Sequence, residues 1–239
     1  MAQSFFIWNG MDCRAMGVSM RGPAAIIRPE ERVQHVQIPG RSGDLTVIEG
    51  ENIYNSYIQT ASIVVTGGYR VRDVYQWLRG SGYVTFSGEP DKRQQARIIG
   101  AITLNRISRN LDKWAGEVQF YCQPLKELLM ADTAILSASG NTIWNYGDVI
   151  SRPMWKVNIA SGQTSITLAS CGKSIIVTGL TGGTVIWIDS GTMEVWNSGK
   201  TALLTKDSTG DFPVLAPGAN TVTGSGWTTV EIDKRERYL

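Results

Sequence analysis

"TVIWIDSGTMEVWNS" (residues 184–198) places two short apolar runs on either side of a turn. The runs are rich in Val, Ile and Trp, and the residues between them, Asp-Ser-Gly, favour a tight turn. The spacing predicts a β-hairpin with strands over 184–190 and 193–198. Because the first run is unbroken, we expect Trp187 in the core. Alternation along the second strand places Trp196 on the same face as Glu194.

Further strand candidates surround this hairpin, at 165–170, 174–180, 201–205, 220–224 and 227–233. Seven short strands separated by turn residues predict a β-sandwich. The preceding segment 125–141 suits either a short helix or an extended connector, and 137–141 has the composition of a linker. Residues 1–131 hold 15 Lys and Arg against 12 Asp and Glu, and residues 132–239 hold 8 against 9. We therefore predict two domains, 1–131 and 132–239.

The first half of the chain is also rich in strand signals, at 61–67, 82–88, 96–108 and 116–123. The last two flank a polar stretch, 109–115, and predict a hairpin. One segment has helical spacing instead: Val71, Val74, Tyr75 and Leu78 fall on one face of a helix over 70–78. The predicted fold class is mainly β with one short helix.

Composition narrows the class of protein. The chain has 42% hydrophobic residues, a net charge of +2 and a pI near 8.4, which is typical of a folded domain without a strong affinity for nucleic acid. No run approaches a membrane span, and the N-terminus lacks the basic lead of a signal peptide. The cysteines Cys13, Cys122 and Cys171 are expected to be buried thiols in a protein made in a reducing cytoplasm.

Catalytic and metal-binding patterns are weak. His35 is the one histidine and has no Cys or carboxylate at ligand spacing, so we expect a strand or rim residue. The glycines at 170–174 and 179–183 lack the spacing of phosphate-binding and dinucleotide-binding loops, and we expect turns there.

Paired carboxylates are the remaining route to an enzyme. Glu49 with Glu51, and Asp189 with Glu194, are spaced as a glycoside hydrolase pair could be, but solvated strand faces offer such pairs in most proteins. We therefore predict no enzymatic activity, no catalytic residues, no cofactor and no metal.

Binding features carry more weight. Trp144, Trp155, Trp187, Trp196 and Trp227 all lie in the second domain. Trp196 beside Glu194 suits a sugar-stacking site, an anchor for a neighbouring protein, or incidental exposure. Seven arginines lie between residues 70 and 109. They are expected either to face solvent or to contact a neighbouring subunit.

Several stretches together resemble the distal tail (Dit) proteins of phages. They are WNGMDCRAMGV (8–18), IPGRSGDLT (38–46), YQWLRGSGYVTFSGEPDKRQQARIIG (75–100), NYGDVISRPMWKVNIASGQTSITL (145–168) and GDFPVLAPGANTVTGSG (210–226). The resemblance implies an N-terminal ring-forming domain and a C-terminal galectin-like β-sandwich. Another tail-tube or tail-tip protein, or a carbohydrate-binding module, is the alternative.

The same resemblance implies a structural role at the tip of a long, non-contractile tail. It implies a hexamer, as one ring or two stacked rings, that surrounds a channel for DNA. The implied partners are the tail-tube protein, the tail-associated fibre protein and receptor-binding proteins, without a membrane. The implied location is the virion tail tip, after synthesis in the bacterial host cytoplasm.

Residues 38–57 resemble the part of the family's first domain that reaches toward a neighbouring subunit. The expected interface residues are Arg41, Asp44, Glu49, Tyr54, Tyr57, Arg70, Arg72, Arg106, Arg109 and Trp196. The expected structural positions are Gly40, Gly43, Gly147, Asp148, Pro153, Phe212, Pro213, Pro217, Gly218 and Asn220.

The segment 210–224 has an apolar yet turn-rich composition. We expect a rigid arch over the end of the sandwich, with Phe212 and Leu215 packed on a sheet. Gly218 is expected to adopt a left-handed turn, and Asn220 to bond turn backbone through its side chain. The arch is expected to lead 220–224 into a hairpin with 227–233, and Phe212→Ala to cost roughly 3–5 kcal/mol.

Overall fold

A long antiparallel pair forms the centre of the first half of the chain: β6 (Tyr57–Thr66) and β10 (Lys113–Leu128). Side chains alternate along both strands, so that Ala61, Ile63 and Val65 of β6 are buried together with Val118 and Phe120 of β10. This two-residue period is what packs one face of the sheet onto a core and leaves the other to solvent.

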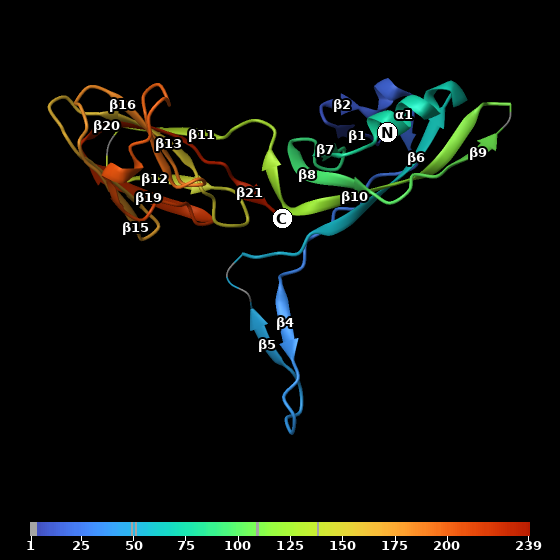
Figure 1. Ribbon diagram of the computed structural model, residues 1–239, viewed down its shortest axis with the longest axis horizontal. Helices are drawn as coiled ribbons and strands as arrows, with labels where there is room; N and C mark the ends of the chain where they lie inside the picture. The colour runs from blue at the N-terminus through green and yellow to red at the C-terminus, as the bar shows by residue number, and fades with distance from the viewer. Residues whose placement is uncertain (1–3, 49, 51, 109, 138) are drawn as a thin grey trace. The chain divides into compact units, whose positions relative to one another are not determined.

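The computed structural model describes residues 4–48, 50, 52–108, 110–137 and 139–239. The chain divides into unit 1, residues 1–129 with Leu239, and unit 2, residues 130–238. Across the described residues the fold is mainly β, and α1 (Val71–Trp77) is a short helix in unit 1 (Figure 1). The predicted fold class is confirmed.

The sheet of unit 1 runs in the order β2-β1-β7-β8-β10-β6-β3, and β9 also pairs with β10. The remaining strands are β1 (Phe6–Trp8), β2 (Met11–Asp12), β3 (Val18–Met20), β7 (Ser81–Phe86), β8 (Lys92–Ile99) and β9 (Leu104–Ser108). A separate hairpin joins β4 (Val33–Val36) to β5 (Leu45–Ile48). Short 3-10 turns are η1 (Cys13–Met16) and η2 (Gly68–Arg70).

An aromatic cluster fixes the centre of unit 1. The Phe120 ring lies 5.5 Å from that of Phe6 and 5.6 Å from those of Trp8 and Phe86. Trp77 of α1 stacks on Phe6 at 5.6 Å with the planes 8° apart. Such contacts stabilise the fold beyond the apolar area that they bury.

The predicted helix is confirmed, with one correction to its buried face. Val74 and Leu78 are buried, but Tyr75 is 40% exposed, and Trp77 turns toward the core in its place. The predicted hairpin around 109–115 is formed by β9 and β10. The strand predicted over 96–108 is interrupted between β8 and β9, and both parts pair with β10.

Unit 2 is a β-sandwich, as predicted. Its described residues form one sheet in the order β11-β20-β13-β16-β17 and another in the order β12-β19-β14-β15-β18. Inward side chains of both sheets make a continuous core that includes Trp155, Leu168, Ile188, Val222 and Ile232. The described residues of the segment 125–141 form strands and turns and no helix, so the connector alternative applies.

The first sheet contains β11 (Thr133–Leu136), β13 (Met154–Ile159), β16 (Val185–Asp189), β17 (Glu194–Asn197) and β20 (Trp227–Asp233). The second contains β12 (Asn141–Asn145), β14 (Ile166–Ser170), β15 (Lys173–Val177), β18 (Ser208–Gly210) and β19 (Gly218–Ser225). The short strand β21 (Arg237–Tyr238) follows β20, and η3 (Thr205–Asp207) precedes β18.

The hairpin that opened the sequence analysis is confirmed as β16 and β17, with Asp189 opposite Glu194. The strand predicted at 201–205 is wrong. There the Asn197 carboxamide oxygen accepts from the amides of Thr201 at 2.8 Å and Ala202 at 3.2 Å, so the backbone forms a turn. The predicted hairpin between 220–224 and 227–233 is also wrong, because β19 and β20 belong to opposite sheets.

Candidate assembly surfaces

The hairpin of β4 and β5, with its connecting loop 37–44, is called the arm. Both strands pair only with each other among the described elements (Figure 1). Most of the arm's side chains are exposed. The register places Val36 opposite Leu45 and Gln34 opposite Val47, so these four side chains share a face. Val36, Leu45 and Val47 are 43%, 41% and 41% exposed. Two-stranded hairpins are marginal in water, so this apolar face suits a partner.

Main-chain bonds close the base of the arm. The amide of Arg32 donates to the carbonyl of Ile53 at 2.9 Å, and that of Asn55 to Glu30 at 2.8 Å. Tyr54, an expected interface residue, is 9% exposed in this closure and is therefore a packing residue. It lines an open cavity of about 560 Å³ with Glu31, Ile48, Gly50, Asn52 and Ile53.

The other expected residues of this segment are spread along it. Arg41 and Asp44 are exposed in the loop at the tip of the arm, beside Gly40 and Gly43. Tyr57 begins β6 and is partly buried, and its hydroxyl donates to Gln94 at 3.1 Å. Burial raises the pKa of Tyr57 to about 12. Glu49 lies outside the described residues, as does Glu51.

The expected arginine positions lie away from the arm, near the end of β6 and around β9. Arg72 is exposed on α1, and the Arg70 guanidinium bonds the Tyr69 hydroxyl at 2.9 Å. Arg106 pairs with Asp112 at 3.3 Å, and its guanidinium lies over the Trp114 ring. Arg109 lies outside the described residues.

Asp112 connects this region internally. Its carboxylate accepts from the Gly68 amide at 2.5 Å and from the Trp114 indole at 3.2 Å. The Gly68 amide, followed by Trp114 and Arg106, lowers the pKa of Asp112. Arg106 therefore already has a partner within the chain.

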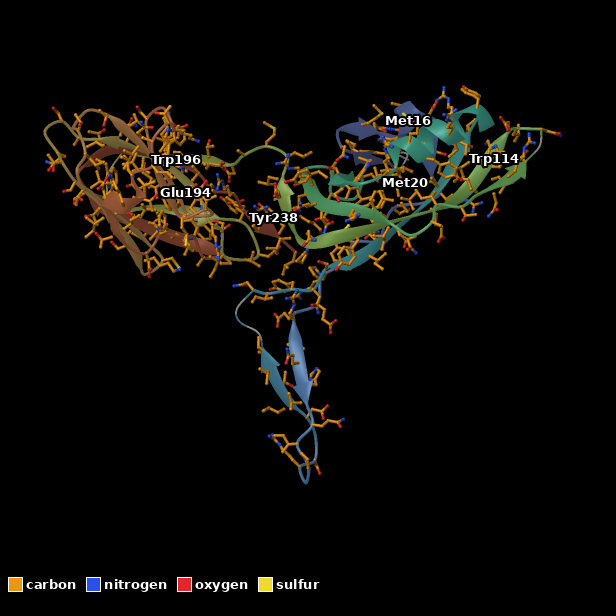
Figure 2. The ribbon with its side chains drawn as sticks, viewed as in Figure 1. Met16, Met20, Trp114, Glu194, Trp196 and Tyr238 are labelled. Carbon is orange, nitrogen blue, oxygen red and sulfur yellow. The ribbon has the colours of Figure 1, made fainter. Side chains whose placement is uncertain are left out.

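In unit 2, Trp187 and Trp196 are direct cross-strand neighbours on the outer face of their sheet. The core prediction for Trp187 is wrong: Ile186 and Ile188 point inward, while Lys200 lies 4.1 Å from the Trp187 ring centre. The predicted shared face of Trp196 and Glu194 is present, and the Trp196 indole donates to Glu194 at 3.3 Å (Figure 2). Trp196 is only partly exposed.

The arch over 210–217 has the contacts of a structural element. Leu215 is fully buried, and its amide and carbonyl bond the backbone of Ser151 at 3.1 and 2.9 Å. The carbonyl of Pro213 accepts from the Ser190 hydroxyl at 2.6 Å. Phe212 packs against the core but is only partly buried, and Pro217 is exposed.

Asn220 bonds the turn backbone, as expected. Its carboxamide oxygen accepts from the Ala216 amide at 2.9 Å, and its amide group donates to Ala216 at 2.7 Å and Gly218 at 2.9 Å. Gly218 has a φ of +89°, which favours glycine.

The loop 145–153 packs beneath the arch. The buried Asn145 side chain donates to Leu215 at 3.0 Å and accepts from the Gly147 amide at 2.9 Å. The Asp148 amide bonds Arg237, and the Pro153 carbonyl accepts from Ser190 at 3.0 Å.

The sequence-based candidates for catalysis make contacts within the fold. His35 is an exposed β4 residue whose ring lies 3.3 Å from the Thr46 hydroxyl. Asp189 lies opposite Glu194 in the β16–β17 register, but its carboxylate forms an ion pair with Arg235. Among described residues, no group of three His, Cys, Asp or Glu side chains is placed to hold a metal ion.

Cys13 and Cys122 are buried, whereas Cys171 is exposed at a turn, so the expectation of three buried thiols is wrong for it.

No helix among the described residues is long and apolar enough to cross a membrane. These features define a class by fold: a mainly β protein with a β-sandwich unit and an exposed hairpin.

Comparisons with known proteins give one family profile and two similar structures. Residues 146–238 match the profile described as "Siphovirus-type tail component, C-terminal domain". The crystal structure of SPP1 Dit (gp 19.1), titled a paradigm of the hub adsorption apparatus in Gram-positive infecting phages, aligns with a TM-score of 0.80 and 16% identity. That alignment covers 100% of both chains. The phage P2 baseplate in its activated conformation with Ca aligns at a TM-score of 0.47 and 8% identity, over 100% of this chain and 99% of that one. No curated protein matches the sequence.

The matched residues 146–238 all lie in unit 2, and the resemblance to distal tail proteins is confirmed. The chain has the Dit fold along its full length.

Proposed function

We propose that this tail component is the subunit of a hub at the tip of a long, non-contractile phage tail. Six copies close a ring through unit 1, and the ring surrounds a channel through which DNA leaves. The hub joins the tail tube to the tail-associated fibre protein, and unit 2 carries contacts to receptor-binding proteins. The protein is made in the host cytoplasm and ends in the virion tail tip.

The arm is the observation that carries this proposal. A closed ring needs a heterologous contact, in which one surface of a subunit meets a different surface of the next. An exposed hairpin with Val36, Leu45 and Val47 on one face supplies such a contact, because association removes that apolar area from water.

The charge of the chain supports passage of DNA. A channel wall that neutralised many phosphates would hold the DNA through counterion release. With a net charge of +2, the chain lacks the strong basic excess of such a wall.

The test compares two arm variants by light scattering and negative-stain imaging. The triple change Val36→Thr, Leu45→Thr and Val47→Thr keeps strand-forming residues but makes the apolar face polar. Its control is the double change His35→Thr and Thr46→Ser on the opposite face.

We expect the triple variant to lose the ring at concentrations where the control keeps it, while both retain the β-rich circular dichroism spectrum of the unchanged protein. A triple variant that assembles as well as the control would contradict the role of the arm.

A further inference from the structure

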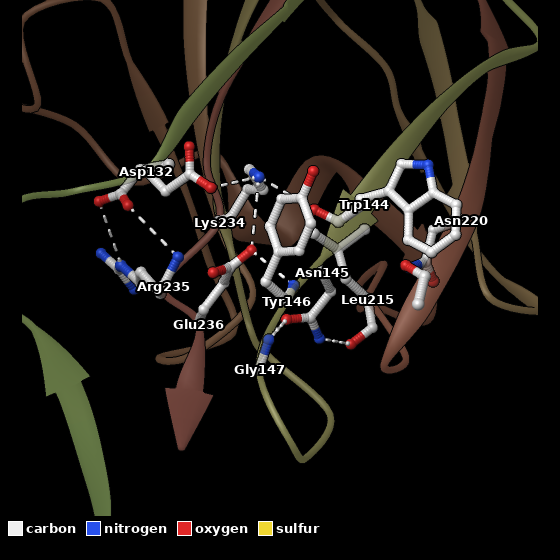
Figure 3. A network of polar contacts seen from close by, with 12 residues as sticks. Asp132, Trp144, Asn145, Tyr146, Gly147, Leu215, Asn220, Lys234, Arg235 and Glu236 are labelled. Atoms are coloured by element: carbon white, nitrogen blue, oxygen red, sulfur yellow. Dashed lines mark hydrogen bonds and ion pairs between the residues drawn. The ribbon is translucent and has the colours of Figure 1, made fainter.

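Two exposed aromatic side chains lie on the edge strand β12 and just beyond it. Trp144 is 54% exposed and Tyr146 is 67% exposed. Their ring centres are 6.4 Å apart and their planes 20° apart, and Figure 3 shows the rings side by side. At 6.4 Å the two rings do not cover one another face to face, so together they form a broad aromatic surface.

A buried polar network holds the backbone beneath these rings (Figure 3). Lys234 is 6% exposed, and its Nζ donates to the Trp144 carbonyl at 2.9 Å. Glu236 is 4% exposed, and its carboxylate accepts from the Tyr146 amide at 2.9 Å. Lys234 also pairs with Asp132 and with Glu236, the latter at 3.4 Å.

This network fixes the aromatic surface at both residues. Burying an ammonium and a carboxylate costs free energy, which pairing only partly offsets. Rings on a backbone fixed in this way lose little conformational freedom when a ligand binds.

A shallow cavity of about 440 Å³ lies along the same edge. Trp144, Tyr146 and Lys234 line it together with Ala134, Ile135, Leu136, Asn141, Thr142 and Ile143. The Lys234 ammonium lies 5.0 Å from the Tyr146 ring centre. The lining combines aromatic and aliphatic side chains with hydroxyl groups, a carboxamide and the ion-paired Lys234 ammonium, and its volume is in the range of small-ligand sites.

The outer face of the adjoining sheet has an unusual composition. Starting at the edge strand β12, its outward residues by register are Thr142 and Trp144, then Ala219, Thr221, Thr223 and Ser225, then Thr167 and Ala169, then Ser174 and Ile176, and finally Thr209. None of these carries a charge. The outer face of the opposite sheet carries the Lys156–Glu231 ion pair and Glu194. Solvated sheet faces usually carry charges, so an uncharged face points to a ligand without charge.

We propose that Trp144 and Tyr146 form the binding surface for a neutral glycan. The C–H groups on one face of a pyranose ring are weakly positive and lie well on the negative face of an aromatic ring. The hydroxyls around the sugar rim match Asn141 and Thr142. This site is separate from the arm and does not depend on ring formation.

An added polypeptide strand is the competing occupant, and one contact opposes it. A strand that extends the sheet must bond the free carbonyls along the outer edge of β12. The Trp144 carbonyl already accepts a bond from Lys234. At this edge the exposed side chains of Trp144 and Tyr146 are therefore more accessible to a ligand than the backbone is.

The test applies the full-length protein to a glycan microarray that carries neutral and acidic glycans, and then titrates the neutral glycan that binds best. Trp144→Ala and Tyr146→Ala are compared with Trp187→Ala, which removes a tryptophan from the outer face of the opposite sheet as the matched control. Thermal melting and solution mass are recorded for each protein, so that loss of fold or of assembly is told apart from loss of binding.

We expect saturable binding of a neutral glycan, weakened about tenfold or more in each of the two site variants and unchanged in Trp187→Ala. Three results would overturn the proposal: no neutral glycan bound, binding that persists in a Trp144→Ala, Tyr146→Ala double variant, or equal loss in the control. Capture of a protein segment at these residues, without glycan binding, would assign the edge to polypeptide instead.

Discussion

Asp189 and Arg235 form a two-point ion pair that joins the β16–β17 turn to the end of β20. Arg235 Nη1 lies 2.8 Å from Asp189 Oδ1, and Nη2 lies 3.1 Å from Oδ2. The same carboxylate accepts from the amides of Gly191 at 2.8 Å and Thr192 at 3.2 Å. The turn that sequence spacing identified is therefore held by a partner 46 residues away.

This pair predicts a pH-dependent stability. Burial acts to raise the pKa of Asp189, but the bonds from Arg235, Gly191 and Thr192 outweigh it, and the pKa lies below the ordinary aspartate value of 3.8. The contribution to stability is therefore complete above that pH and is lost as pH falls through the folded-state pKa. Asp189→Asn should lower the free energy of unfolding by about 2 kcal/mol at pH 7, and by clearly less at about pH 2.5.

Urea denaturation at the two pH values measures this difference. Asp233→Asn is the control, because Asp233 contacts Arg235 at only 3.8 Å and is more exposed. Its cost should stay below about 1 kcal/mol. A constant difference between Asp189→Asn and the unchanged protein at both pH values would contradict the assignment.

Asn220 should be one of the most sensitive polar positions of unit 2. Asn220→Ala removes three hydrogen bonds to the turn at 216–218 and leaves their backbone partners unpaired. We expect a loss of roughly 2–3 kcal/mol in chemical denaturation. Thr221→Ala, at an exposed position on the same strand, should change stability by less than about 0.5 kcal/mol.

The burial of the arch residues predicts which of two truncations lowers the free energy of unfolding more. Leu215→Ala should cost roughly 3–5 kcal/mol, because Leu215 is fully buried in the sandwich core. Phe212→Ala should cost about half as much, because its ring is only partly buried. This revises the cost expected from sequence for Phe212. A larger loss for Phe212→Ala than for Leu215→Ala in urea denaturation would show that the arch is anchored by the aromatic ring instead.

Thiol reactivity should separate the cysteines. Cys171 is exposed, with a φ of 51°, in the turn between β14 and β15. Burial raises the pKa of Cys13, and raises that of Cys122 to about 12, which suppresses their reactive thiolates. With a thiol reagent near pH 8, we expect one thiol per chain to react rapidly in the folded protein, and all three to react rapidly in urea. Loss of the rapid reaction of the folded protein in Cys171→Ser completes the test.

The predictions that held depend on local signals. The helix at 71–77 follows from apolar spacing, and the β16–β17 hairpin from two apolar runs around Asp-Ser-Gly. Both are fixed by residues near in sequence, so the chain alone specifies them.

The predictions that failed depend on distant partners. An unbroken apolar run does not show whether the Trp187 side chain lies on the inner or the outer face of its sheet. In the structure the ring lies on the outer face, where the Lys156 and Lys200 ammonium groups lie over it. The chain passes from β19 to β20 across the sandwich, and the short turn between them looks like that of a hairpin. The Trp144–Tyr146 surface was missed because Lys234 and Glu236, which hold it, lie 90 residues away.

The central claim is that unit 1 closes a ring. The most direct measurement is the solution mass of the full-length protein by light scattering over a range of concentrations, with negative-stain images of the same sample. The account predicts about six or about twelve copies of the 26.2 kDa chain, seen as rings with a central hole. A monomer at every concentration, with no ring in the images, would contradict it.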